Sequence, residues 1–298
     1  MTSLQVHVFG KLRLQHGEVR IETFPTRRVE ELLGFLIASP HTRHTREKLI
    51  DTLWPDIPLR NGRASLSTAL WRLRTVFDRL NLPSGDYFIT NRDWIRFEPS
   101  GAFTLDLAEF NQFIGEAERT EDGKKRESAL RSAIDLYRGS FCEGIYAEWC
   151  LLERERLERR YLWAMGQLMD LLMQHQTYEE AARIGKDILQ CDPLREEVHR
   201  AVMHCFWKLG RRSQAVRQFQ LCARSLQSEL RILPMPETIA LYQKIISERL
   251  GELRINGREP ALFENKIDEA YEAFLKAIAD LNSLLEYVDK LPEERVKA

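Results

Sequence analysis

The 298-residue chain has little cysteine and no long hydrophobic run, and both shortages exclude classes of protein. Its five cysteines are an odd number without a close Cys-x-x-Cys pair, which indicates reduced, mostly buried thiols. The longest strongly apolar run, residues 32–38, is broken by Gly34 and is far too short to cross a bilayer. The N-terminus, MTSLQVHVFG, has no basic start followed by an apolar block, so no secretory signal is expected. We therefore expect a cytoplasmic protein without a membrane partner.

The sequence also lacks the usual signatures of catalysis and metal binding. It contains no Gly-rich phosphate loop, no His-Glu-x-x-His and no Gly-x-Ser-x-Gly. His199 and His204, with Cys205 beside them, invite a metal site, but a spacing of five places the two histidines on different faces of a helix. His41 and His44 lie in a polar stretch, where we expect them to be solvated. We expect no enzyme, no metal and no cofactor.

Composition and charge describe a folded protein with an uneven charge distribution. The chain is 44% hydrophobic and 30% charged, and its length allows two domains, each with its own core. The net charge of −1 hides a basic stretch over residues 1–100 and an acidic one over 251–298. The imbalance is small, but a basic N-terminal third agrees with a polyanionic partner there.

The stretch RASLSTALWRLRTVFDRL, residues 63–80, has the spacing of an amphipathic helix. Its apolar stripe, at gaps of four and three, consists of Leu66, Leu70, Leu73, Phe77 and Leu80. Pointing away from the stripe are Thr68, Trp71, Arg72 and Thr75, with Arg63 and Arg74 on its shoulders. A basic, hydroxyl-bearing face fits a helix that enters a DNA groove, and it fits an ordinary surface helix equally well.

The elements around this helix favour the first interpretation. Alternating residues within 4–24 predict short strands, and a helix is expected over residues 28–38. Thr45 is expected to cap a further helix that Pro55 stops, and a loop over residues 56–62 leads into the basic helix. After it, residues 87–97 predict a hairpin with a two-residue polar turn. Three helices followed by a hairpin form a winged helix-turn-helix, whose third helix reads the major groove.

From residue 105 to about residue 250 the pattern is almost entirely helical, so the fold class is mainly α. TYEEAARIGKDILQCDP and RRSQAVRQFQLCARSLQ align with Ala181 over Ala215 and Ile188 over Cys222. The offset of about 34 residues is the tetratricopeptide period. We therefore predict tetratricopeptide-like helical repeats, followed by a C-terminal helix.

The C-terminal tail carries a strict alternation of apolar residues by four and three. The positions are Ile267, Tyr271, Phe274, Ile278, Leu281, Leu285 and Val288. Such a seam over about three heptads suits a coiled coil that makes a homodimer. A long helix packed on its own domain is the alternative, and both interpretations stay open.

Several of these stretches together resemble the SARP-type family of activators. They are LIDTLWPD, NGRASLSTALWRLRTVF, AIDLYRGSF, AEWCLLERERLERR and CDPLREEVHRAVMHCFWKLGRRSQAVRQF. That family joins an OmpR-type winged helix to a bacterial transcriptional activation domain built from tetratricopeptide-like helices. The resemblance covers about residues 4–250. It departs at LRILPMPET, where the family commonly has a glycine-containing turn, and no nucleotide-binding or ligand-sensing domain is visible in these residues.

The resemblance implies a domain plan and partners. We expect a winged helix-turn-helix over residues 1–100, an activation domain over 104–250 and a helical extension over 251–298. Family membership implies sequence-specific binding to promoter DNA, often to direct repeats by side-by-side protomers. It also implies contact with RNA polymerase, at the sigma factor and at the C-terminal domain of the alpha subunit.

Arg72 and Arg74 lie where OmpR-type relatives touch DNA, and an arginine can pair with guanine or grip a phosphate. Thr68 could touch a thymine methyl or a phosphate, with the small Ser67 beside it. Trp71 either contacts the sugar-phosphate backbone or packs on the preceding loop. The other DNA-contact candidates are Asn61 and Arg63 near the helix start, and Thr90, Asn91, Arg92 and Arg96 in the wing.

The residues leave rival roles open. Each arginine could instead be solvated or paired within the chain, and the turn at Arg92 could be a plain solvated turn. The loop before the basic helix faces polymerase in OmpR-type folds, which makes Asp56 and Arg60 candidates for that contact. Besides a transcription activator, the sequence allows a tetratricopeptide-type sensor or scaffold that binds a ligand or protein and whose DNA binding is secondary.

Overall fold

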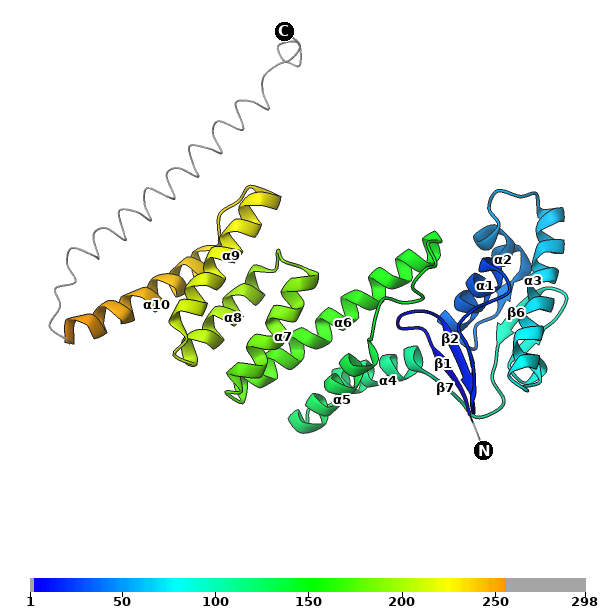
Figure 1. Ribbon diagram of the computed structural model, residues 1–298, viewed down its shortest axis with the longest axis horizontal. Helices are drawn as coiled ribbons and strands as arrows, with labels where there is room; N and C mark the ends of the chain where they lie inside the picture. The colour runs from blue at the N-terminus through cyan, green and yellow to red at the C-terminus, as the bar shows by residue number, and fades with distance from the viewer. Residues whose placement is uncertain (1–2, 256–298) are drawn as a thin grey trace, which may run out of the picture. The chain divides into compact units, whose positions relative to one another are not determined.

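The computed structural model describes residues 3–255 (Figure 1). The chain divides after Leu171 into two compact units, and each is described by itself. The expected dimerisation seam, from Ile267 to Val288, lies outside the described residues. No helix within residues 3–255 is long and apolar enough to cross a membrane.

Four short strands form the first sheet of the N-terminal unit. They are β1 (Leu4–His7), β2 (Arg13–His16), β3 (Val19–Ile21) and β7 (Phe103–Leu105). Their order is β3-β2-β1-β7, with β1 antiparallel to β2 and parallel to β7. The alternation of apolar residues predicted the first three strands, because Leu4, Val6 and Leu14 must share one buried face. The fourth strand, β7, was not predicted.

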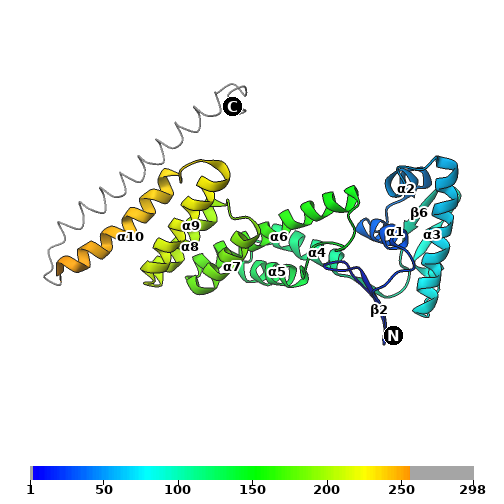
Figure 2. The same cartoon turned by 45° about the horizontal axis from the view of Figure 1, so that its top comes forward.

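Three helices and a second small sheet follow. The elements are α1 (Arg27–Ala38), β4 (His44–Thr45), α2 (Arg46–Leu53), α3 (Leu59–Arg79), a 3-10 turn η1 (Ser84–Asp86), β5 (Phe88–Thr90) and β6 (Trp94–Phe97). The sheet order is β4-β6-β5, and α3 packs on α1 and α2 (Figure 1 and Figure 2). This arrangement confirms the winged helix-turn-helix, with the β5–β6 hairpin as its wing.

The start of α3 differs from the prediction. The helix begins at Leu59, four residues before Arg63, because the backbone N–H groups of Asn61 and Gly62 both donate to the carbonyl of Pro58. Gly62 is therefore helical and buried, and was wrongly assigned to a loop. The apolar stripe is confirmed, since Leu66, Leu70, Leu73, Phe77 and Leu80 are all buried.

His44 was also wrongly expected to be solvated. Its side chain is only 4% exposed and meets the Phe35 ring edge-on at 5.0 Å. His44 lies in β4, where it pairs with Ile95, and this two-residue strand was not predicted. The next residue, Thr45, caps α2 as expected, because its hydroxyl accepts the N–H of Lys48 at 3.2 Å.

Three further helices complete the first unit. They are α4 (Asp106–Arg119), α5 (Gly123–Leu136) and α6 (Glu148–Gln174), whose last turn passes into the second unit. α4 and α5 pack on each other, and the Asp122 side chain caps α5 through the N–H groups of Lys124 and Lys125.

The second unit is an array of packed helices. They are α7 (Tyr178–Cys191), α8 (Glu196–Lys208), α9 (Arg212–Leu230) and α10 (Pro236–Ile255). α8 packs between α7 and α9, and α10 packs on α8 and α9. The four residues of the 34-residue echo, Ala181, Ile188, Ala215 and Cys222, are fully buried. Their tetratricopeptide identity stays a prediction.

The departure at LRILPMPET has a local explanation. Arg231 ends α9 with a left-handed backbone, φ +57° and ψ +32°, and its N–H donates to Leu226. Helices commonly end in this conformation with glycine, which has no Cβ to crowd the carbonyl. Arginine thus adopts here the backbone that glycine favours.

Candidate nucleic-acid interface

The outward face of α3 carries most of the predicted DNA-contact residues. Trp71 is 63% exposed and lies opposite the buried stripe, so most of its indole is accessible. Arg63, Thr68 and Arg74 are exposed beside it, while Arg72 is half-buried at the edge of this face. The face thus presents an indole between cationic side chains, an arrangement that suits the backbone and base edges of DNA.

The hydroxyl groups on this face are already engaged. Ser67 Oγ donates to the Arg63 carbonyl at 2.8 Å and Thr68 Oγ1 donates to the Ala64 carbonyl at 3.0 Å. Thr75 Oγ1 donates to the Arg72 carbonyl at 2.7 Å. Because the Thr68 hydroxyl proton is used within the helix, its methyl group is the part best suited to a thymine methyl.

Two arginines of α3 contact other elements of the winged helix. Arg63 lies 3.5 Å from the Glu47 carboxylate, but its side chain remains 65% exposed. Arg74 Nη2 donates to Thr90 Oγ1 at 3.3 Å, which links α3 to the wing. The Arg63–Glu47 contact is an exposed ion pair, a kind that stabilises weakly.

The wing tip is shaped by Asn91. Its Oδ1 atom accepts the N–H groups of Asp93 at 2.9 Å and Trp94 at 2.8 Å, and its own N–H donates to the Trp94 carbonyl at 3.1 Å. These bonds close the polar turn that the sequence predicted. Asn91 therefore organises the turn, and Arg92 is the exposed cation at its tip.

Arg96 is placed differently from Arg92. Its Nε lies 2.7 Å from the Glu98 carboxylate, its guanidinium lies 5.6 Å from the centre of the Trp94 ring, and only 23% of its side chain is exposed. Arg96 thus stabilises the wing from within, which makes it the weakest of the predicted DNA contacts.

Sequence reasoning missed two arginines beside the wing. Arg43 lies over the Trp94 ring at 4.7 Å, and Arg46 donates from Nε and Nη2 to the Asn91 carbonyl at 3.1 and 3.0 Å. Both contacts join segments about fifty residues apart. No spacing within either segment signals them, because they depend on the pairing of β4 with β6.

The segment before α3 carries the predicted polymerase contacts. Asp56 is exposed in the turn after α2, and Arg60 is exposed in the first turn of α3, with Asn61 next to it. The turn is closed by a bond from the Ile57 N–H to the Trp54 carbonyl at 3.3 Å. The negative charge of Asp56 and the positive charge of Arg60 are thus four residues apart in the sequence, and both are accessible.

The winged helix is joined to the later helices of the first unit through its N-terminal sheet. Gly10 donates to Ser140, Cys142 donates to Val8 at 2.7 Å, and Glu143 donates to Gly10 at 2.8 Å. The segment before α6 therefore extends the sheet edge by backbone pairing. On the other side of the joint, the Trp149 ring packs edge-on against Phe35 of α1 at 5.2 Å.

The buried carboxylate of Asp106 holds the same joint. It accepts the backbone N–H groups of Val8, Phe9 and Leu107, at distances between 2.8 and 3.2 Å. Burial raises the pKa of Asp106 to about 6, against the effect of these donors, which favour the charged form. His7 Nδ1 lies 3.8 Å away, and burial lowers the pKa of His7.

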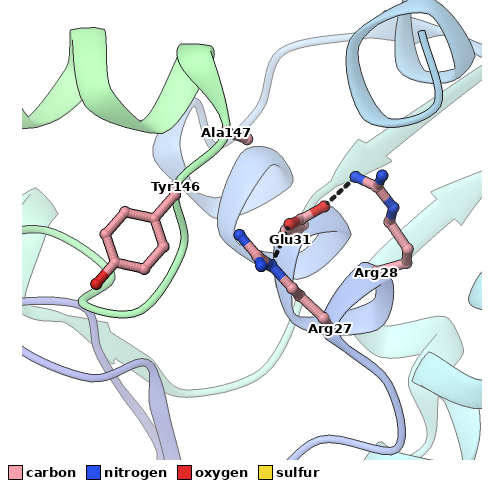
Figure 3. A pocket seen from close by; sticks show the side chains of 5 residues that line it. All are labelled: Arg27, Arg28, Glu31, Tyr146 and Ala147. Atoms are coloured by element: carbon pink, nitrogen blue, oxygen red, sulfur yellow. Dashed lines mark hydrogen bonds and ion pairs between the residues drawn. The ribbon is translucent and has the colours of Figure 1, made fainter. Parts of the chain in front are cut away.

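A small pocket lies between α1 and the segment before α6 (Figure 3). Figure 3 shows Tyr146 and Ala147 facing Arg27, Arg28 and Glu31. Glu31 is 2% exposed and accepts from Arg27 Nε at 2.9 Å and Arg28 Nη1 at 2.6 Å. This carboxylate holds both guanidinium groups on α1, and the pocket lies at the joint between α1 and the segment before α6.

The histidines considered for metal binding have other contacts. His199 is buried, with Nε2 3.1 Å from the Pro193 carbonyl and Nδ1 2.7 Å from Gln218 Nε2. Burial lowers the pKa of His199 and of His204. Within residues 3–255, no group of three or more His, Cys, Asp or Glu side chains is placed to hold a metal ion. Cys142, Cys150, Cys205 and Cys222 are buried free thiols, and Cys191 is exposed.

Comparison with known proteins finds one matching domain family and two related regulatory proteins. Residues 105–246 match the bacterial transcriptional activator domain. The regulatory protein AfsR of Streptomyces coelicolor is 28% identical over 250 residues, and AfsR of Streptomyces griseus is 26% identical over 249. Each alignment covers 82% of this chain and 24% of the relative, so the chain spans about a quarter of the length of these curated relatives.

A solved structure shares the fold. Mycobacterium tuberculosis EmbR, in complex with a low-affinity phosphopeptide, superposes with a TM-score of 0.70 at 17% identity. The match covers 83% of this chain and 66% of that one. EmbR shows the shared fold alone. The domain match and the sequence relatives show that this chain carries a bacterial transcriptional activator domain behind its winged helix-turn-helix, the domain plan of the SARP-type family.

Proposed function

We propose that this regulator is a sequence-specific DNA-binding activator of transcription, without enzymatic activity, that acts in the bacterial cytoplasm. The observation that supports it most is the outward face of α3, where Trp71 is 63% exposed among Arg63, Thr68 and Arg74. On a helix that faces only solvent, an exposed indole leaves apolar surface in water without a packing partner. Against DNA, the same face has a binding partner, with α3 in the major groove and the wing tip on the backbone.

Arg72→Ala and Arg74→Ala test this assignment. Each base-contacting arginine is expected to contribute about 1–3 kcal/mol, so each substitution lowers affinity for the preferred duplex and relaxes the preference at one position. The measurement is selection of bound duplexes from a random pool at two salt concentrations, followed by titration of the enriched motif. An enriched direct repeat with a steep salt dependence supports the proposal. Unchanged affinity and preference in both variants would contradict the site assignment.

The activator also needs a route to RNA polymerase. We propose that Asp56 and Arg60, exposed before and at the start of α3, contact the polymerase, either at the sigma factor or at the C-terminal domain of the alpha subunit. Charge reversal at either residue is expected to lower transcription from the selected promoter while leaving DNA affinity unchanged. A parallel loss of DNA affinity would instead place these residues at the DNA.

A second candidate function belongs to the helices of the second unit. A groove of about 650 Å³ is lined mainly by charged residues of α7, by Phe206 of α8, by Arg211 just before α9 and by Gln214 within it. Its walls contain the two-point ion pair between Arg211 and Glu179, at 2.8 and 2.9 Å. A sensor or scaffold would bind a peptide or small molecule here, and partners retained after nuclease treatment would favour it.

A further inference from the structure

The wing is fastened to the first turn of α2 by a single arginine. The backbone N–H of Arg46 donates to the Asp93 carbonyl at 3.0 Å, and its guanidinium donates to the Asn91 carbonyl from Nε at 3.1 Å and Nη2 at 3.0 Å. Arg46 therefore holds both residues that flank Arg92. Two N–H groups that donate to one carbonyl oxygen fix the orientation of the guanidinium as well as its distance from that oxygen, which a single donor does not.

Contacts of the surrounding elements add to this fastening. Thr45 pairs with Trp94 across β4 and β6, and the same residue caps α2. On the other side of the hairpin, Arg74 of α3 donates to Thr90 at 3.3 Å. The wing is thus attached at two points, one on α2 and one on α3, and the exposed Arg92 lies in the turn between Asn91 and Asp93, which are exposed as well.

We propose that Arg46 is a positioning residue for DNA binding: it sets the place of the wing tip so that Arg92 meets the DNA backbone while α3 lies in the groove. Arg46 does this through the protein backbone and not by touching DNA itself. The inference rests on the proposed DNA-binding function and assigns a role to a residue outside the predicted contacts.

The first test is a double-mutant cycle on the full chain, with the selected duplex as ligand. Arg92→Ala is expected to lower affinity by about tenfold, the loss of one charge-assisted contact, and to reduce the salt slope by about one. Arg46→Ala is expected to produce most of the same loss without changing the enriched motif. The double variant is expected to bind no more weakly than Arg92→Ala. Additive losses, with a salt slope reduced by about two, would show that Arg46 grips a phosphate itself and would overturn the proposal.

Arg46→Lys is the matched control, because it keeps the charge and removes the two-donor geometry. The proposal expects the lysine variant to bind more weakly than the wild type. Full recovery of affinity and salt slope by lysine would overturn it.

The second test needs no DNA. Hydrogen exchange of the Asn91, Asp93 and Trp94 amides in the free protein is expected to be severalfold faster in Arg46→Ala and unchanged in Arg92→Ala, at equal thermal stability. Equal protection in Arg46→Ala would overturn the fastening itself. If the wild type enriches no duplex, the proposed function fails, and this exchange result still decides whether Arg46 holds the wing.

Discussion

Asp106 is the residue whose chemistry departs furthest from its usual behaviour. Its pKa is raised by burial from 3.8 to about 6, so the folded protein holds a proton there that the unfolded chain releases at lower pH. The resulting stabilisation is complete below about pH 4 and is lost as the pH rises through about 6. Above that pH the contribution stays constant. A shift of this size corresponds to about 3 kcal/mol.

Urea unfolding of the wild type and Asp106→Asn between pH 4.5 and 7.5 measures this effect, because asparagine does not titrate. The unfolding free energy of the wild type minus that of Asp106→Asn is expected to fall as the pH rises toward 6 and then to level off. If the value of wild type minus variant instead rises with pH, the three backbone N–H donors keep the carboxylate charged in the fold.

Single residues also show how far the sequence can be interpreted. The exposed cations and Trp71 on α3 follow from helical periodicity alone, because that helix lies on an apolar core. The local roles of Asn91 and Arg96 do not follow from it. Asn91 bonds within its own turn, and Arg96 lies against Glu98, so each is engaged by neighbours that come together only after the hairpin forms.

At the scale of elements, Gly62 controls how closely α3 approaches α2. A Cβ atom at Gly62 would overlap Cγ2 of Ile50, which is itself buried. Gly62→Ala is therefore expected to lower the unfolding free energy by about 1–3 kcal/mol, despite the better helix propensity of alanine. Gly166 in α6 is the matched control, since no atom lies within 4 Å of a Cβ placed there.

Thermal or urea unfolding of both variants measures the contrast. Gly166→Ala is expected to be neutral or to raise stability by about 0.5–1 kcal/mol, because it removes backbone freedom from the unfolded chain. Equal effects of the two substitutions would show that α2 and α3 are not packed as closely as described.

The elements that sequence reasoning missed share one cause. β4 has only two residues and β7 only three, and both exist because a distant strand pairs with them. The long periodic helices were predictable because each carries its own apolar stripe. The early start of α3 was missed because Gly62, usually a helix breaker, is required there by packing.

At the scale of the whole molecule, the first unit joins the winged helix-turn-helix to the start of the activation domain. Backbone pairing of residues 8–10 with 140–143, the Asp106 carboxylate and the Phe35–Trp149 contact all cross the boundary expected near residue 100. We therefore expect the winged helix and the helices that follow it directly to move as one body. The domain boundary expected near residue 100 marks the change from a mixed to an almost entirely helical sequence pattern. The backbone and side-chain contacts between the two parts continue across it.

The last prediction concerns the tail. The seam from Ile267 to Val288 places an apolar residue every three or four positions, a narrow stripe that a helix buries best against a copy of itself. Homodimerisation through it would tether two winged helices and so strengthen binding to an operator that holds two sites. Sedimentation of the full chain is expected to give dimers, and a chain ending at residue 255 is expected to give monomers that bind such an operator more weakly. Monomers in both would reject the coiled coil, and dimers in both would move the interface into residues 1–255.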